Sequence, residues 1–345
     1  MNREFVLRAL TAVGMGAAIV VLAILLWYAR RVFLLAFAGI LLAVLLQTLA
    51  AWLKRFTGLP YRWSVAVVVL ALLGGIGLLG WLVGSGVSQQ LDELAEALPN
   101  SVDKLRDRLD QTTWGKRLAT RLPQAAQSIS PQDVLAPATG VVSGLLGFLV
   151  NLVVILFVGL YGAAQPGWYL HGFLHLFPPP RRERLRHVLQ ETGDALRWWL
   201  IGQLVSMTAV GLLTGLGLWL LGAQLPIALA LLAFAMDAIP NLGPILAGVP
   251  AILLASAQGP SQALYVALLY VGINAVEGYV LIPLVQMRTV KLPPALLILA
   301  VLAFSMLGGP LGALVAAPFL LTIINLVRML YVEDALGDHS LASEQ

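Results

Sequence analysis

Long apolar runs without a charged residue constrain this chain more than any other feature of its sequence. Such runs occupy residues 9–29, 32–53, 63–87, 138–164 and 198–221. A helix needs about 20 apolar residues to cross the hydrocarbon layer of a bilayer. Only 11% of the residues are charged and 59% are hydrophobic, whereas about a quarter of the residues in soluble domains are charged. The sequence therefore predicts an all-α polytopic membrane protein.

The first apolar run could also be part of a cleaved signal peptide, because Arg3 and Arg8 precede it. The run is too long for a signal peptide, however, and Arg30 and Arg31 follow it in place of a small-residue cleavage site. An uncleaved membrane anchor is the interpretation that we adopt.

About eight transmembrane segments are expected, some of them discontinuous or re-entrant in the second half. The predicted organisation comprises three amino-terminal transmembrane helices (1–87), an extramembrane amphipathic helical segment (88–137), a fourth transmembrane helix with its exit (138–177), a cytoplasmic interfacial amphipathic helix (178–197), a carboxy-terminal transmembrane core with broken helices (198–332) and a short acidic tail (333–345).

The distribution of cations predicts the orientation. Ten Lys and Arg residues fall on one predicted side of the membrane, at the amino terminus, at 54–62 and at 181–197. The short loop on the other side holds only Arg30 and Arg31. Because cytoplasmic loops are enriched in cations, we expect a multi-pass protein of the cell (inner) membrane with a cytoplasmic amino terminus.

Several classes of enzyme are excluded. The chain has no Cys, which removes thiol catalysis, Cys-based zinc sites and iron–sulfur clusters. It contains no GxxxxGK[ST], HExxH or GxSxG motif. The spacing of His171, His175 and His187 is not that of a metal site. We therefore expect no enzyme activity, cofactor, metal or nucleic-acid partner, and expect the bilayer and a small molecule or ion as partners.

Two acids lie inside apolar stretches of the last third of the chain. The first, Asp237, begins the segment DAIPNLGP (237–244). Pro240, Gly243 and Pro244 interrupt a helix there, and Asn241 adds an amide side chain. Backbone groups freed at a break cannot face lipid, so they must face protein or a wet cavity. Broken helices of this kind form the substrate sites of many transporters.

The second acid, Glu277, lies in NAVEGYVLIP (274–283). Tyr270, Asn274 and Glu277 follow one another in steps of four and three, so they are expected to share one helix face. This face is predicted to line a substrate or ion pathway beside the break at Asp237. Two alternatives remain: the polar groups hold helices together, or the acids lie at the water interface.

A weaker signal is the segment Gly308-Gly309-Pro310-Leu311-Gly312, which divides two apolar stretches. It predicts a hinge or the tip of a re-entrant hairpin, and the hairpin is preferred.

The carboxy-terminal motifs resemble those of the autoinducer-2 exporter-like family, the PerM-type permeases. The similar segments are DAIPNLGP (237–244), NAVEGYVLIP (274–283), VKLPPALLIL (290–299) and GGPLGALVAAPFLL (308–321). The resemblance implies a membrane protein of about eight spans that exports small molecules and forms homo-oligomers, pentamers among them. It also implies cation/proton antiport as an activity of some relatives. The role of Asp237 transfers less readily than those of Pro240, Asn241, Gly243 and Pro244.

The functional hypothesis is a secondary transporter that exports a small, signalling-type molecule by alternating access, with coupling to protons through Glu277. A cation/proton antiporter and a non-transporting membrane scaffold are the alternatives.

Overall fold

The computed structural model describes residues 3–74, 141–240, 242–281 and 292–338. Regular structure in these ranges is helical throughout. The helices are α1 (Arg3–Thr57), an unlabelled helix (Tyr61–Gly74), α6 (Val141–Ala164), α7 (Pro166–His175), α8 (Pro179–Leu220), α9 (Pro226–Met236), α10 (Gly243–Gln258), α11 (Pro260–Val276), the π-helix η1 (Glu277–Leu281), α13 (Pro294–Val327) and the π-helix η2 (Arg328–Glu333).

The predicted class, an all-α polytopic membrane protein, is confirmed. Four helices of the described ranges are long and apolar enough to cross a bilayer, or five if the bent pair of α6 and α7 counts as one span. The predicted extramembrane segment (88–137) lies outside the described residues, as does part of the predicted third span.

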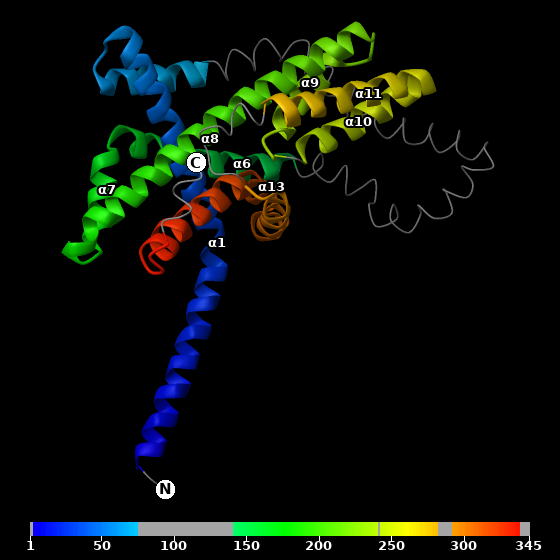
Figure 1. Ribbon diagram of the computed structural model, residues 1–345. Coiled ribbons are helices and arrows are strands. Elements are labelled where there is room, and N and C mark those ends of the chain that lie inside the picture. The colour runs from blue at the N-terminus through cyan, green and yellow to red at the C-terminus, as the bar shows by residue number, and fades with distance from the viewer. Residues whose placement is uncertain (1–2, 75–140, 241, 282–291, 339–345) are drawn as a thin grey trace.

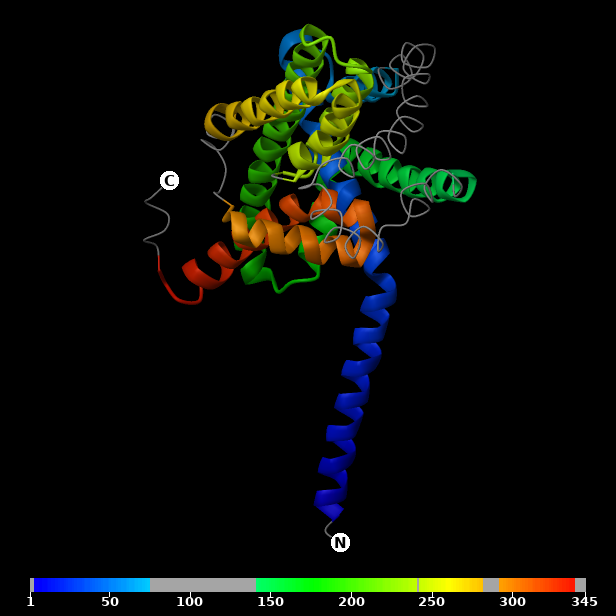
Figure 2. The same cartoon turned by 90° about the vertical axis from the view of Figure 1, so that its right-hand side faces the viewer.

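Helix α1 differs from the sequence-based expectation. A chain reversal was expected at Arg30 and Arg31, but α1 continues through both as one helix of 55 residues, which is about 80 Å at 1.5 Å per residue. Its amino-terminal part extends away from the rest of the described chain (Figures 1 and 2). The physical reason is local, because no Pro or Gly lies between Gly16 and Gly39 to end the helix.

The chain bends by 91° between α6 and α7. Pro166 begins α7 and has no backbone N–H, so the carbonyl of Gly162 loses its helical partner. Gln47 of α1 replaces that donor at 3.1 Å, and the Tyr61 hydroxyl donates to the carbonyl of Ala163 at 2.9 Å. Side chains of two neighbouring helices therefore satisfy the backbone at the bend.

Helix α8 also differs from expectation. The interfacial helix predicted at 178–197 and the span predicted at 198–221 form a single helix of 42 residues. No Pro occurs between Pro180 and Pro226, so no residue forces the helix to end between them. Near its start, Arg184 forms ion pairs of 2.9 Å with Glu333 and with Asp334. These contacts join the first turns of α8 to the end of the chain that follows α13.

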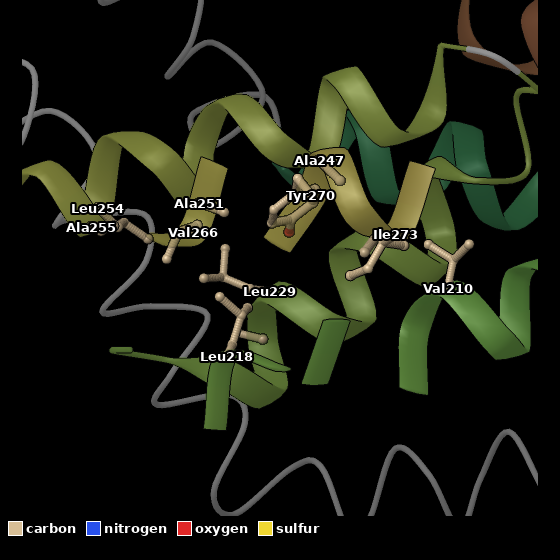
Figure 3. Packing of buried hydrophobic residues seen from close by; sticks show 12 residues of the cluster. Val210, Leu218, Leu229, Ala247, Ala251, Leu254, Ala255, Val266, Tyr270 and Ile273 are labelled. Atoms are coloured by element: carbon tan, nitrogen blue, oxygen red, sulfur yellow. The ribbon is translucent and has the colours of Figure 1, made fainter. Parts of the chain in front are cut away.

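The largest apolar core of the carboxy-terminal part lies among α8, α9, α10 and α11 (Figure 3). Leu218 of α8, Leu229 of α9, Ala251 of α10 and Val266 of α11 are all buried in it. This packing holds the two helices on either side of the 237–244 break against a common support.

Helix α13 reverses its direction at Gly309, whose φ of 62° and ψ of −142° are not helical. Leu297 and Val301 before the reversal share a core with Ala316 and Ala317 after it. A Cβ added to Gly312 would collide with the carbonyl oxygen of Phe304, so the two arms meet closely at the tip. The first arm, residues 294–308, is about 22 Å long, shorter than the roughly 30 Å needed to cross a bilayer. Gly308 and Pro310 flank the reversal.

Candidate functional site

The interruption between α9 and α10 forms the first part of the candidate site. Helix α9 ends at Met236, and α10 begins at Gly243 with Pro244 in its first turn. Pro240 supplies no backbone donor within the turn. The N–H of Gly243 donates to the carbonyl of Ile239 at 2.9 Å, which closes the turn.

Residue 243 must be a glycine for this turn to close. A Cβ at this position would meet the carbonyl oxygen of Met236 and would lie 2.6 Å from the Cα of Asp237. Both are backbone atoms, which cannot move aside as a flexible side chain could. The start of α10 is therefore pressed against the end of α9, and Gly243 and Pro244 are both buried there.

Two carboxyl groups from different elements meet beside this turn. Asp237, which follows α9, is 0% exposed, and Glu277, which begins η1, is 5% exposed. Their carboxyl groups are neighbours, and the hydroxyl of Ser206 from α8 also adjoins Asp237. We call Ser206, Asp237 and Glu277 the acid cluster.

The acid cluster is short of hydrogen-bond partners. Both carboxylate oxygens of Asp237, Oε2 of Glu277 and Oγ of Ser206 are buried without an aligned partner in the described part of the chain. No Lys or Arg of the described ranges forms an ion pair with either acid. Because a buried, uncompensated negative charge is strongly unfavourable, this arrangement favours uptake of a proton or of a cationic or hydrogen-bonding ligand.

Gln203, one turn before Ser206 on α8, positions the break. Its Nε2 donates to the backbone carbonyl of Asp237 at 2.6 Å. A carbonyl at a helix end lacks its helical partner, and the Gln203 side chain supplies one. Helix α8 therefore contacts both the backbone and the side chain of Asp237.

The predicted face of α11 is only partly observed. Tyr270 and Glu277 are buried, but Asn274 is exposed, and Ile273 occupies the buried position between them. Asn274 lies at the edge of the buried stripe, because four residues advance a helix by 400° and not by a whole number of turns. Tyr270 packs on α10 in the core, where its ring lies against Gly248. Asn241 lies outside the described residues.

The burial of both acids bears on the alternatives. Asp237 is fully buried and Glu277 is 5% exposed, so both acids lie against protein. Ser206, Asp237 and Glu277 come from three different elements and lie against one another, so an adhesive role between helices stays an alternative to a pathway. Within the described ranges, no group of three or more His, Asp or Glu residues could hold a metal ion.

Sequence reasoning missed Ser206 and Gln203. Both are polar residues within the apolar stretch 198–221, three positions apart, and therefore lie on one side of α8. That spacing was the available signal. Which helix this side would face could not be deduced without the tertiary structure.

Several apolar helices of membrane-spanning length define the class of the chain, a multi-pass membrane protein. The family model described as "AI-2E family transporter" matches residues 17–331. The chain belongs to this family of membrane transporters, as the resemblance of its motifs predicted.

Known proteins similar to the chain carry transport names as well. It is 31% identical over 348 residues to "Putative transport protein MT0215" of Mycobacterium tuberculosis (strain CDC 1551 / Oshkosh), covering 91% of this chain and 90% of the relative. It is 27% identical over 312 residues to "AI-2 transport protein TqsA" of Escherichia coli (strain K12), covering 88% and 86%. It is 26% identical over 300 residues to "Putative transport protein YrrI" of Bacillus subtilis (strain 168), covering 84% of each chain.

Proposed function

We propose that this membrane transporter exports a small, signalling-type molecule by alternating access, and that the acid cluster couples the movement to protons. The observation that carries the proposal is the juxtaposition of buried Asp237 and Glu277 at an interrupted helix, where no Lys or Arg of the described ranges forms an ion pair with either acid. A relative named for AI-2 transport supports a small signalling molecule as the cargo.

In the proposed cycle, the cargo occupies the space beside the α9–α10 break. Protonation of Glu277, and of Asp237 in a two-proton version, removes negative charge from the cluster. A neutral cluster crosses an apolar environment at a lower desolvation penalty than a charged one, so the loaded element can change its exposure. Release of the proton on the other side resets the site.

The decisive experiment is flux in proteoliposomes that hold purified protein, measured with and without a pH gradient. Glu277→Gln keeps the size and hydrogen-bonding capacity of the side chain but cannot exchange a proton, so the pH-dependent part of the flux should disappear. Glu191→Gln is the matched control, because Glu191 lies exposed on α8, away from the cluster. An unchanged pH dependence in Glu277→Gln refutes proton coupling through this residue.

Cation/proton antiport is a second candidate, and the same two buried acids favour it. An antiporter would make the vesicle lumen change pH when sodium is added, without any organic cargo. Glu277→Gln should remove this response and Glu191→Gln should not. If the protein is instead a scaffold, neither cargo flux nor a sodium-driven pH change will be detected, and Glu277→Gln will change only stability.

Homo-oligomerisation, the inner-membrane location and the cytoplasmic amino terminus stay predictions. Labelling of single Cys residues introduced into this Cys-free chain tests the orientation directly. A Cys placed at Arg3 should react only after the membrane is permeabilised if the amino terminus is cytoplasmic.

A further inference from the structure

The amino-terminal helices form an apolar cavity that is open on one side and distant in sequence from the acid cluster. The cavity has a volume of about 130 Å³ and lies between α1, the Tyr61–Gly74 helix and α6. Its walls include Leu42 and Leu46 of α1, Val69 and Leu73 of the Tyr61–Gly74 helix, and Phe157 and Leu160 of α6. We call this cavity the α6 groove.

Every residue that lines the α6 groove is Leu, Val or Phe. Water needs two to four polar partners to occupy a cavity, and apolar cavities of this kind stay dry. The groove also lies along the candidate membrane span of α1, Ala29–Thr57. Its occupant must therefore be apolar, and the bilayer supplies acyl chains.

An occupant can reach the groove from outside the described chain. Phe157 is 58% exposed, Leu73 is 47% exposed and Leu160 is 39% exposed. These side chains present apolar surface beside the cavity, and lipid chains would cover that surface in a membrane.

A cation lies about two helical turns beyond the lining residues of the Tyr61–Gly74 helix. Arg62 precedes Val69 by seven positions and Leu73 by eleven, so all three share one face of the Tyr61–Gly74 helix. Seven residues correspond to about 10 Å along a helix. Arg62 is exposed, and no acid of the described ranges forms an ion pair with it. Its neighbours Tyr61 and Trp63 are of the type found at membrane–water interfaces.

We propose that the α6 groove seats an acyl chain of an anionic phospholipid, and that Arg62 binds the phosphate of its head group. The apolar walls of the groove match the acyl chain of such a lipid, and Arg62 matches the negative charge of its phosphate. Basic pockets between transmembrane helices bind anionic head groups for the same electrostatic reason.

The test measures lipid binding to the purified full-length protein in detergent by native mass spectrometry. Phosphatidylglycerol and phosphatidylcholine with identical acyl chains are the two probes. The wild-type protein should retain phosphatidylglycerol more tightly. Arg62→Gln should weaken its binding about five-fold, towards that of phosphatidylcholine, because one cation contact is lost.

Two matched controls separate the groove from the general surface. Arg55 lies nine residues after Leu46, on the opposite face of α1, so Arg55→Gln should leave binding unchanged. Leu160→Trp places a bulky ring in the groove and should reduce binding of both lipids. Leu152→Trp makes the same change on α6, at a similarly exposed position (37%) that does not line the groove, and should have no effect.

Equal binding of the two lipids by wild-type protein overturns the proposal. So does an equal loss from Arg55→Gln and Arg62→Gln, which would indicate only a diffuse electrostatic attraction. Unchanged lipid binding by Leu160→Trp would likewise show that the α6 groove is not the binding site. Each variant's thermal unfolding is recorded alongside, so that a loss of folding is recognised as such.

Discussion

Buried polar groups in the amino-terminal and carboxy-terminal parts of the chain differ in how completely they are hydrogen-bonded. In the amino-terminal part, the buried hydroxyl of Thr48 donates to the carbonyl of Val44 at 2.7 Å, and Gln47 and Tyr61 donate to carbonyls of α6. In the described carboxy-terminal ranges, buried oxygens without an aligned hydrogen-bond partner occur on Ser206, Thr214, Asp237, Tyr270, Glu277 and Asn325. An unsatisfied buried polar group costs about 1–3 kcal/mol, so the second set weakens the fold.

The proposed function accounts for part of this difference, at the acid cluster. Polar groups that only support a fold are expected to find partners, as those of α1 and the Tyr61–Gly74 helix do. Under the proposed function, the acids beside the broken helix instead bind a ligand or a proton during transport. The contrast can be tested by replacing polar groups in each part and comparing stability with activity.

The largest effect is expected from the double variant Asp237→Leu/Glu277→Met. Transport should fall to background because the acid cluster is gone. The free energy of unfolding should stay equal or rise by as much as about 4 kcal/mol, because apolar residues replace buried ionisable groups. Vesicle flux and thermal unfolding in detergent measure the two outcomes. A variant that transports normally but unfolds more easily would reverse the assignment and make the acids structural.

Gly243→Ala should lower the free energy of unfolding by about 1–3 kcal/mol. Its Cβ meets backbone atoms of Met236 and Asp237, so the break must open to accommodate it. Gly272→Ala on α11 is the control, since its Cβ would meet nothing within 4 Å. Gly272→Ala should be neutral or stabilising by up to about 1 kcal/mol, because Ala favours the helix. Equal effects of the two substitutions would mean that the break is not closely packed.

Tyr61→Phe should lower the free energy of unfolding by about 1 kcal/mol, because the carbonyl of Ala163 at the α6–α7 bend loses its donor. Transport should persist, because the bend is remote in sequence from the acid cluster. The exposed Tyr265 provides the control, and Tyr265→Phe should change neither property. Chemical unfolding monitored by fluorescence measures the difference. Loss of transport without loss of stability in Tyr61→Phe would contradict the assignment of a structural role to the amino-terminal part and of transport to the carboxy-terminal part.

The smallest effect is expected at Arg184, whose ion pairs join the start of α8 to Glu333 and Asp334. Arg184 is 37% exposed and Asp334 is 38% exposed, so water screens their interaction. Arg184→Gln should cost less than about 1 kcal/mol, and the cost should shrink at high salt. Arg181→Gln, an exposed neighbour, serves as the control. A loss that is larger and independent of salt would indicate a buried structural role.

Features encoded by neighbouring residues could be predicted from the sequence. Uncharged apolar runs indicated a helical membrane protein, and the two prolines and the glycine of 237–244 indicated a helix break that the structure contains. The segment at 308–312 was expected to be a hinge or tip, and the chain reverses at Gly309. In each case the determining factor is a missing N–H, a missing Cβ or the absence of charge, all of which are local properties.

Helix continuity was less predictable. Cations at Arg30 and Arg31 suggested a loop, yet α1 passes through them, and Arg31 donates to Asn151 of α6 at 3.5 Å. A charged pair in the sequence does not disclose whether it will find a polar partner on another helix. Helix continuity here follows from the absence of Pro and Gly between Gly16 and Gly39, which the two cations obscured.

By itself, the sequence determined the class of protein, the position of the break and the identity of the two acids. Only the tertiary structure decided that Asp237 and Glu277 meet, that Ser206 and Gln203 of α8 join them, and that Asn274 points elsewhere. The physical reason is that backbone breaks depend on adjacent residues. The neighbours of a buried side chain depend instead on how helices distant in sequence pack together.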